Sequence, residues 1–228
     1  MIRISRLTIG KDTEFAVLNV QTRGDLSSLR WYESPLGYTS LSNKADDRSL
    51  CSVYYAPLNF RDVMIATGKL SPSALYGKVA TAENLLGLEF SGRDCTGRRV
   101  TSMIEAQSMA TVAAADPVFL WEVPEKWSLE EACTIPVAYS TAYYALVVRG
   151  KMRRGDSLLV HSGSGGVGQA AISVALSMGC TVFTTVGSFE KREFLKRRFP
   201  QLSDRNFANS RDLSFEDHVL LETEGRGK

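Results

Sequence analysis

Hydrophobic and polar positions follow two different periods along the chain. In its first half, short apolar runs at 15–20, 50–55 and 98–103 alternate with glycine turn signals, a pattern that predicts β-strands. Beyond them the apolar spacing becomes helical, and it begins with a capping box in which Ser128 is followed three residues later by Glu131. The pattern therefore predicts a β-rich module followed by an α/β module.

The α/β module alternates apolar runs of strand length with amphipathic stretches of helix length. Strands are predicted at 157–161, 180–186 and 205–208, and helices at 140–150, 168–178, 190–199 and 214–221. The polar stretch 36–48 shows neither period and predicts a loop. We therefore expect two domains, 1–128 and 129–228, of which the second holds about half of a doubly wound sheet.

Composition and charge narrow the class of partner. Of 228 residues, 44% are hydrophobic and 23% charged, and 27 basic against 25 acidic residues leave a net charge of +2. That balance favours a small ligand over nucleic acid or a membrane surface. There is no apolar run of the roughly 20 residues that a transmembrane helix needs and no signal peptide at the start, so we expect a cytoplasmic protein. The four cysteines and two histidines are spaced too widely to predict a metal site or disulfides.

The most specific motif is a glycine turn between the strand at 157–161 and the helix that follows. Gly163, Gly165 and Gly168 fit the G-x-G-x-x-G pattern of a dinucleotide site, in which they serve a tight turn, the approach of a pyrophosphate and helix packing. Free N–H groups and the helix dipole would hold the phosphates. The predicted phosphate-binding residues are Gly163, Ser164, Gly165, Gly166, Val167 and Gly168. A glycine turn without a ligand is the alternative, although so many glycines cost backbone entropy that a plain connection does not need.

The end of the next strand indicates which dinucleotide binds. An NAD site places a carboxylate there for the ribose 2′-hydroxyl, but this chain has Ser188, Lys191 and Arg192. Glu190 stands inside the start of the next helix, where it suits the helix dipole better than the ribose. A hydroxyl and two cations favour the 2′-phosphate of NADPH, whereas a merely solvated helix face is the alternative interpretation.

Five segments resemble the enoyl reductase domain of animal fatty acid synthase, in the zinc-free, quinone-oxidoreductase-like branch of the medium-chain dehydrogenase/reductase superfamily: 24–31, 54–62, 86–92, 139–150 and 161–171. The resemblance implies a β-rich GroES-like domain ahead of a Rossmann domain. It also implies NADPH as hydride donor, an enoyl thioester borne by an acyl carrier protein as substrate, and a homodimer that joins other domains of a multifunctional synthase.

The same resemblance bears on metal and active-site residues. Zinc-dependent members of the superfamily place a cysteine near position 59 and a histidine near position 88, where this chain has Asn59 and Leu88, so no metal is expected. By resemblance, Asn59 and Thr141 lie near the nicotinamide. Local roles explain either residue equally well, Asn59 as a helix cap and Thr141 as a helix-entry hydroxyl.

The chain resembles only part of that domain, because the remaining strands of the Rossmann sheet and the residues usually proposed as proton donors have no counterpart in it. We therefore assign no catalytic residue and expect the 228-residue chain to be inactive alone. Two alternatives remain: the enoyl reductase module of a polyketide synthase, and a non-catalytic fragment that binds nucleotide or serves as an interaction module.

Overall fold

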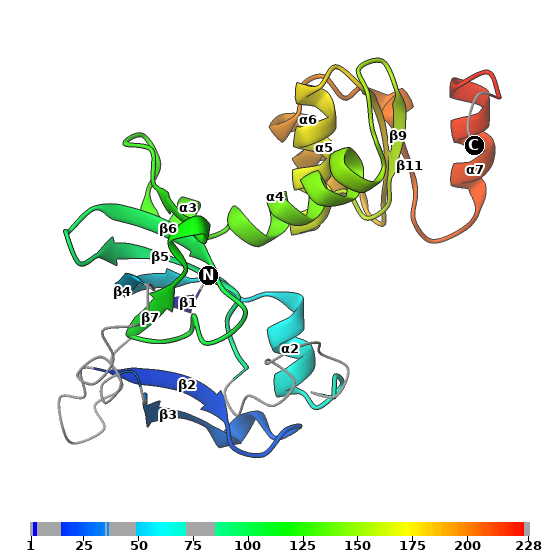
Figure 1. The fold of residues 1–228 in the computed structure, drawn as a ribbon. Coiled ribbons are helices and arrows are strands. Elements are labelled where there is room, and N and C mark those ends of the chain that lie inside the picture. Colours follow the sequence, from blue (N-terminus) through cyan, green and yellow to red (C-terminus); the bar gives the residue numbers. More distant parts are fainter. Residues whose placement is uncertain (1, 4–14, 35, 37–48, 72–84, 226–228) are drawn as a thin grey trace. The chain divides into compact units, whose positions relative to one another are not determined.

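The computed structural model describes residues 2–3, 15–34, 36, 49–71 and 85–225, which fall into two compact units, Met1–Val137 and Ala138–Lys228 (Figure 1). Each unit has a hydrophobic core of its own. The predicted loop at 36–48 lies outside the described residues except for Leu36. The division into domains 1–128 and 129–228 stays a prediction.

The first unit is built on an antiparallel sheet, as its alternating pattern predicts. Across the sheet the strands are β1 (Ile2–Arg3), β4 (Ser49–Ala56), β5 (Glu89–Asp94), β6 (Arg99–Met103) and β8 (Leu120–Glu122), and β7 (Val112–Ala115) pairs with β4. β2 (Ala16–Val20) and β3 (Leu29–Glu33) form a separate antiparallel pair. The helices are α2 (Phe60–Ala66), α3 (Leu129–Ala132) and the 3-10 helices η1 (Leu26–Ser28) and η4 (Pro117–Phe119). This is the β-rich, GroES-like part of the expected fold.

Close packing inside this sheet fixes the position of β5. Cys51, Phe90 and Val100, one from each of three neighbouring strands, are at most 2% exposed. Burying a side chain as large as that of Phe90 stabilises the folded state by about 1.5–3 kcal/mol. Next to them β4 has an irregular register, and a Cβ on Gly92 would overlap the carbonyl oxygen of Ser52, so only glycine fits. β5 is thereby held close to β4, and its first residue enters the candidate site below.

The second unit has a parallel sheet of three strands in the order β11 (Phe207–Asn209), β10 (Thr181–Val186) and β9 (Ser157–Val160). Its helices are α5 (Gly166–Ser177), α6 (Phe189–Arg198), α7 (Ser214–Glu222) and the 3-10 helix η6 (Asp204–Asn206), and α4 (Pro136–Tyr143) with the π-helix η5 (Tyr144–Arg149) precedes β9. This is the Rossmann part of the expected fold, with strand and helix in the predicted alternation.

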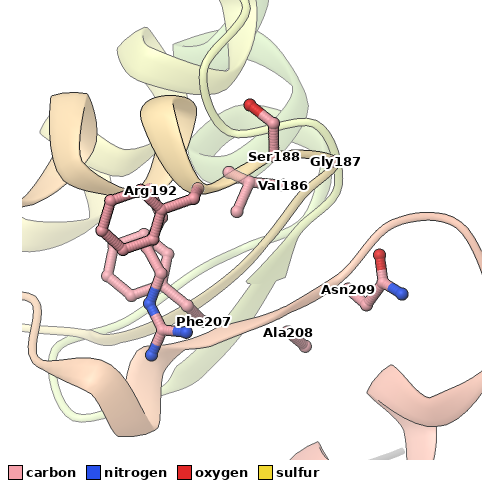
Figure 2. Close-up of a pocket in the computed structure, with 8 residues that line it drawn as sticks. Val186, Gly187, Ser188, Arg192, Phe207, Ala208 and Asn209 are labelled. Carbon is pink, nitrogen blue, oxygen red and sulfur yellow. The ribbon is translucent and has the colours of Figure 1, made fainter.

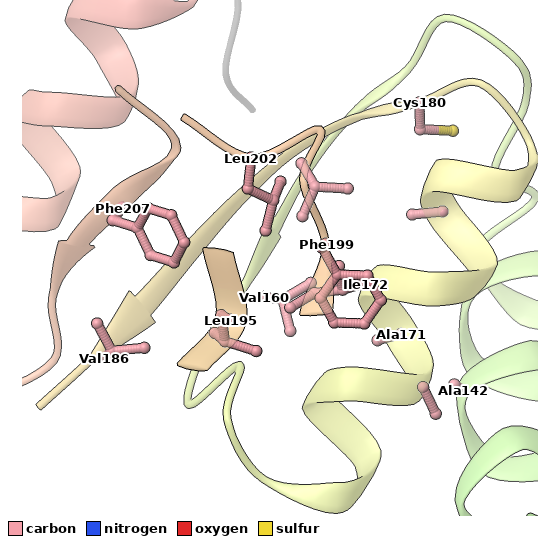
Figure 3. Packing of buried hydrophobic residues seen from close by; sticks show 13 residues of the cluster. Ala142, Val160, Ala171, Ile172, Cys180, Val186, Leu195, Phe199, Leu202 and Phe207 are labelled. Carbon is pink, nitrogen blue, oxygen red and sulfur yellow. The ribbon is translucent and has the colours of Figure 1, made fainter. Parts of the chain in front are cut away.

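The core of this unit lies between the sheet and two helices. Figure 3 shows Val160 of β9 near Ile172 of α5, with Leu195 of α6 and Phe199 directly after that helix, and all four are at most 9% exposed. Because α5 and α6 each follow a strand and pack back on the sheet, the loops that begin them lie at the carboxyl ends of β9 and β10. Both predicted phosphate sites therefore belong to the same edge of the sheet. Within the described part of the chain, every helix is too short or too polar to cross a membrane.

The predicted helix at 140–150 differs from the structure in extent and type. Helix α4 begins earlier, at Pro136, whose fixed φ suits a first helical turn, and it gives way to a π-helix at Tyr144. In that wider turn the N–H of Gly150 donates to the Ala145 carbonyl oxygen at 2.8 Å. A Cβ on Gly150 would lie 2.8 Å from the Leu146 carbonyl oxygen, so glycine allows the turn to close. Apolar periodicity does not distinguish these two kinds of helix.

A buried amide provides a test of the sheet. The Asn206 side chain donates to the Val182 carbonyl oxygen at 2.8 Å and accepts the Ser203 N–H at 2.9 Å, and Asn206 is 8% exposed. We expect Asn206→Ala to lower the free energy of unfolding of the second unit by about 1–3 kcal/mol, because it removes the side-chain donor to the buried Val182 carbonyl oxygen and the acceptor of the Ser203 N–H. Denaturant unfolding measures the change. Gln201→Ala, at an exposed turn after α6, is the control, and an equal effect of both would contradict the interpretation.

Candidate functional site

The glycine turn is held by the two threonines at the end of β10. Thr185 Oγ1 accepts the Ser162 N–H at 3.1 Å and lies 3.3 Å from His161 Nδ1, while the Thr185 carbonyl oxygen accepts the Gly163 N–H at 3.1 Å. Ser162 has a φ of +55°, in the left-handed region that disfavours side chains other than those of glycine, asparagine and aspartate. The left-handed residue of the turn is thus Ser162, whereas we expected Gly163 to make the tight turn.

Two of the motif glycines are required by packing inside the protein. A Cβ on Gly163 would overlap Thr184 Oγ1, and a Cβ on Gly168 would lie 2.6 Å from the Ser162 carbonyl oxygen. Thr184 is fully buried and donates its hydroxyl to the Val160 carbonyl oxygen at 2.8 Å, so it has no room to withdraw. These two glycines let the start of α5 approach the ends of β9 and β10.

Gly165 of the motif and the adjacent Gly166 face away from the protein interior. A Cβ on Gly166 would meet no protein atom within 4 Å, and one on Gly165 would lie 3.4 Å from the Ser162 carbonyl oxygen. Gly165 is the N-cap of α5 and offers no side chain to the N–H groups of the first turn, which have no partner inside the helix. Val167, in that first turn, is 48% exposed. The open space and the N–H groups of this turn suit an anion, and the residues present therefore fit a pyrophosphate.

Ser162, Thr184 and Thr185 are site residues that sequence reasoning missed. A Thr-Thr pair in an apolar run predicts only a strand, because both residues favour β structure. Their role depends on the parallel register that pairs Val160 with Thr184, and this register is a tertiary property. Ser164, by contrast, lies in the turn as expected, and its carbonyl oxygen accepts the Gln169 side-chain amide at 2.9 Å.

An open pocket of about 320 Å³ lies at the carboxyl end of β10, where the 2′-phosphate was expected (Figure 2). Its lining residues are Val186, Gly187, Ser188, Phe189, Arg192, Phe207, Ala208 and Asn209. Ser188 is the N-cap of α6, and its hydroxyl accepts the Lys191 N–H at 3.4 Å. Lys191 is exposed in the first turn of α6 but does not line the pocket. The structure therefore brings Ser188 and Arg192 into one pocket.

Within this pocket the Arg192 guanidinium already has acceptors. Its Nη2 donates to the Asp204 carboxylate at 2.7 Å and to the Asp204 carbonyl oxygen at 3.1 Å. The guanidinium carbon also lies 5.4 Å from the centre of the Phe207 ring, a cation–π contact between two side chains that Figure 2 labels. Lys196 forms a close ion pair with the same carboxylate. The Asp204 carboxylate thus links Arg192 and Lys196 of α6 to η6.

Asn59 stands in the first unit, where it is hydrogen-bonded to buried carboxylates. It is the N-cap of α2, and its N–H donates to Asp62 Oδ2 at 2.9 Å, while its side-chain amide donates to Glu89 Oε1 at 3.0 Å. Glu89 Oε2 also accepts the Val137 N–H at 2.7 Å, in the first turn of α4. Asp62 and Glu89 are 1% and 2% exposed, and burial raises the pKa of both carboxyls despite the hydrogen bonds that they accept.

The helix-cap position that we considered for Asn59 is thus observed, and its role near the nicotinamide stays a prediction. Thr141 is exposed on α4, in the second unit, and its predicted role also stays open. Among the described residues, histidine, cysteine and acidic side chains do not gather in groups of three or more that suit a metal ion. Cys51, Cys133 and Cys180 are buried free thiols, and Cys95 is exposed.

The chain is similar to polyketide synthases and to enoyl reductases of known structure. It is 41% identical over 191 residues to the highly reducing polyketide synthase ZEA2 of Gibberella zeae, a match that covers 82% of this chain and 8% of that protein. The crystal structure of CurK enoyl reductase has 25% identity and a TM-score of 0.80, covering 94% of this chain and 65% of that one. A quinone oxidoreductase from Thermus thermophilus, also solved with NADPH, has 27% identity and a TM-score of 0.63, covering 77% and 55%. No family model matches.

The contact between Gly163 and Thr184 predicts a compensating pair of substitutions. Gly163→Ala forces a Cβ against Thr184 Oγ1, and overpacking of this kind lowers the free energy of unfolding by about 1–3 kcal/mol. Adding Thr184→Ala removes the overlapping atom, so the double variant should lose less than the sum of the single variants. Gly166→Ala, which meets no atom, is the matched control for denaturant unfolding. Strict additivity at positions 163 and 184 would contradict the packing argument.

The raised pKa of Glu89 predicts a pH dependence of stability. A carboxyl whose pKa is higher in the folded than in the unfolded state contributes stability that is complete below its unfolded pKa of about 4 and is lost as the pH rises through the folded pKa. We expect Glu89→Gln to reduce this fall in the free energy of unfolding between pH 4 and neutral pH. Glu122→Gln, an exposed position on β8, should leave the profile unchanged. The comparison is made by urea unfolding across that pH range.

Proposed function

We propose that this chain, which is related to the enoyl reductase domains of the medium-chain dehydrogenase/reductase superfamily in fungal highly reducing polyketide synthases, forms the NADP(H)-binding part of an enoyl-thioester reductase. The chain spans only 8% of the length of the polyketide synthase ZEA2 and 65% of the CurK enoyl reductase chain. The activity of the whole enzyme is therefore part of the proposal.

The observation that carries the proposal is the open space at Gly165 and Gly166. Packing explains the absence of a side chain at Gly163 and Gly168, but at Gly166 a Cβ would meet no protein atom. At Gly166 an alanine would fit without a clash and would restrict the unfolded chain, so packing inside the protein does not require glycine there. A ligand that must approach the backbone here accounts for glycine at both positions, and the N–H groups of the first turn of α5 suit the diphosphate of a dinucleotide.

The residues of this chain bind and orient the dinucleotide in the proposed enzyme. When bound, NADPH would supply the hydride that reduces the double bond of an enoyl thioester. The turn from Gly163 to Gly168 would hold the diphosphate, and Ser188 with Lys191 and Arg192 would surround the ribose 2′-phosphate. Asn59 and Thr141 would contact the nicotinamide end and orient it for transfer. Metal ligands are not part of the proposal.

The similar proteins support an enoyl reductase of a polyketide synthase better than one of a fatty acid synthase. The resemblance to animal fatty acid synthase led us to expect that enzyme first, but the similar proteins from Gibberella zeae, Penicillium oxalicum and Aspergillus fumigatus are highly reducing polyketide synthases. The assignment to fatty acid synthase is therefore not confirmed, and we propose its alternative. The proposed substrate is a trans-2-enoyl chain held as a thioester on an acyl carrier protein, in a cytoplasmic, dimeric, multidomain synthase.

A non-catalytic role remains the second candidate, and one feature of the sheet favours it. In the described sheet β9 is an edge strand, since its only partner there is β10. Such an edge exposes unpaired N–H and C=O groups that pair with another chain.

The two candidates differ in what the 228 residues do alone. We expect the isolated chain to show no turnover in NADPH oxidation with crotonyl thioester and to associate in light scattering, because β9 is unpaired. The complete reductase region of the synthase should turn over. Robust turnover by a monodisperse monomer of the isolated chain would contradict our account of the sheet, and an inactive complete region would favour the non-catalytic role.

Gly165→Val tests the diphosphate cradle directly. The branched side chain would occupy the space where phosphate oxygens approach the backbone, so we expect NADPH binding to fall below detection in a fluorescence titration. Circular dichroism and the thermal midpoint should stay close to those of the unsubstituted protein, because the side chain points to open space. Unchanged NADPH affinity in a folded Gly165→Val variant would refute the cradle.

A further inference from the structure

A buried carboxylate in the first unit joins two elements that the proposed function uses. Glu89, the first residue of β5, is 2% exposed. Its Oε1 accepts the side-chain amide of Asn59 at 3.0 Å, and its Oε2 accepts the Val137 N–H at 2.7 Å. Asn59 is the N-cap of α2, and Val137 lies one turn ahead of Thr141 in α4. Both oxygens of Glu89 are thus occupied by N–H donors.

A carboxylate is a costly side chain for this buried position. The backbone of Glu89 is fixed by the register of β5 with β6, in which Glu89 pairs with Met103. Among the ion pairs of the described residues none involves Glu89, so only the N–H groups that it accepts balance its charge. Burying a carboxylate without a cation costs free energy that an apolar side chain of similar size would not. Packing alone therefore does not account for a carboxylate here.

The charge of Glu89 decides which end of the Asn59 carboxamide faces it. The Val137 N–H can only donate, so Oε2 accepts, and in the ionised carboxylate Oε1 accepts as well. The Nδ2 end of Asn59 must then point to Glu89, because the opposite orientation would bring two acceptor oxygens together. The Asn59 backbone is held independently, since its N–H donates to Asp62 Oδ2 at 2.9 Å, and Asp62 Oδ1 accepts the Gly87 N–H at 2.9 Å. The partly exposed carboxamide of Asn59 is therefore held in one of its two orientations.

We propose that Glu89 is a positioning residue that turns the N–H end of Asn59 inward and so leaves its carbonyl oxygen to accept an N–H of the nicotinamide carboxamide. The inference rests on the proposed function, which places Asn59 at the nicotinamide end, and it names the group that orients Asn59. Glu89 is buried and acts only through Asn59. Its second oxygen anchors the first turn of α4, the helix that carries Thr141. Removing the charge should therefore weaken recognition of the nicotinamide and spare the rest of the dinucleotide.

Glu89→Gln tests this role with almost no change in shape. The Val137 N–H still needs an acceptor, so the glutamine oxygen takes that side, its NH2 group faces Asn59, and the Asn59 carboxamide has to turn over. The probes are NADPH and 2′-phospho-ADP-ribose, of which only the first carries the nicotinamide. Isothermal titration of the 228-residue chain gives the ratio of the two dissociation constants. We expect Glu89→Gln to weaken NADPH about threefold to tenfold and to change 2′-phospho-ADP-ribose affinity less than about twofold.

Ser91→Ala is the matched control, since Ser91 stands on the same strand, is fully buried and donates its hydroxyl to the Leu129 carbonyl oxygen at 2.5 Å. It should lower the thermal midpoint but leave the ratio within about twofold of the unsubstituted chain. Glu89→Asp keeps the charge but is one methylene too short to reach both donors, so it should shift the ratio in the same direction as Glu89→Gln. Circular dichroism and the thermal midpoint confirm the fold of every variant.

The double variant of Asn59→Ala and Glu89→Gln separates action through Asn59 from a general loosening. If Glu89 acts only through Asn59, Glu89→Gln shifts the ratio no further once Asn59→Ala is present. Additive shifts, or an unchanged ratio in Glu89→Gln while Asn59→Ala changes it, overturn the role of Glu89 and leave the proposed function intact. An unchanged ratio in Asn59→Ala shows instead that Asn59 does not contact the nicotinamide, and that part of the proposed function then fails together with the inference.

Discussion

The close approach of helix α5 to the ends of β9 and β10 is the contact on which the candidate site depends. Gly163 lies against Thr184 Oγ1 and Gly168 against the Ser162 carbonyl oxygen, at distances that exclude any side chain. Thr184 and Thr185 fix the other side of this contact through hydrogen bonds to Val160 and to the turn. The first turn of α5 consequently starts at the sheet edge, with its N–H groups directed away from the core.

The four glycines of the turn have two different physical roles. Those at 163 and 168 are buried and serve the protein interior, whereas those at 165 and 166 are exposed and leave space outside it. Only the second pair supports the proposed ligand site. A motif with the same spacing in a chain without such open space would therefore be a packing device, and this difference is visible only when the neighbours of each Cβ are known.

Parallel strands also explain why residues far apart in the chain meet at one edge of the second unit. The turn after β9, the start of α6 after β10 and the segment after β11 all leave the sheet at its carboxyl end. Three separate segments therefore meet at the edge where we propose that the dinucleotide binds. In the first unit, Glu89 joins the side chain of Asn59 to the first turn of α4, so a buried carboxylate organises the residue expected at the nicotinamide.

The sequence by itself determined the β-rich and α/β units, the alternation of strands and helices, the glycine turn and the capping box at Ser128, because periodicity and turn chemistry are local properties. Tertiary structure decided the rest. The π-helix that follows α4, the left-handed Ser162 and the roles of Thr184 and Thr185 depend on which strands pair and in what register. The same holds for Arg192: the sequence places this cation after β10, but its contacts with Asp204 and the Phe207 ring form only in the folded chain.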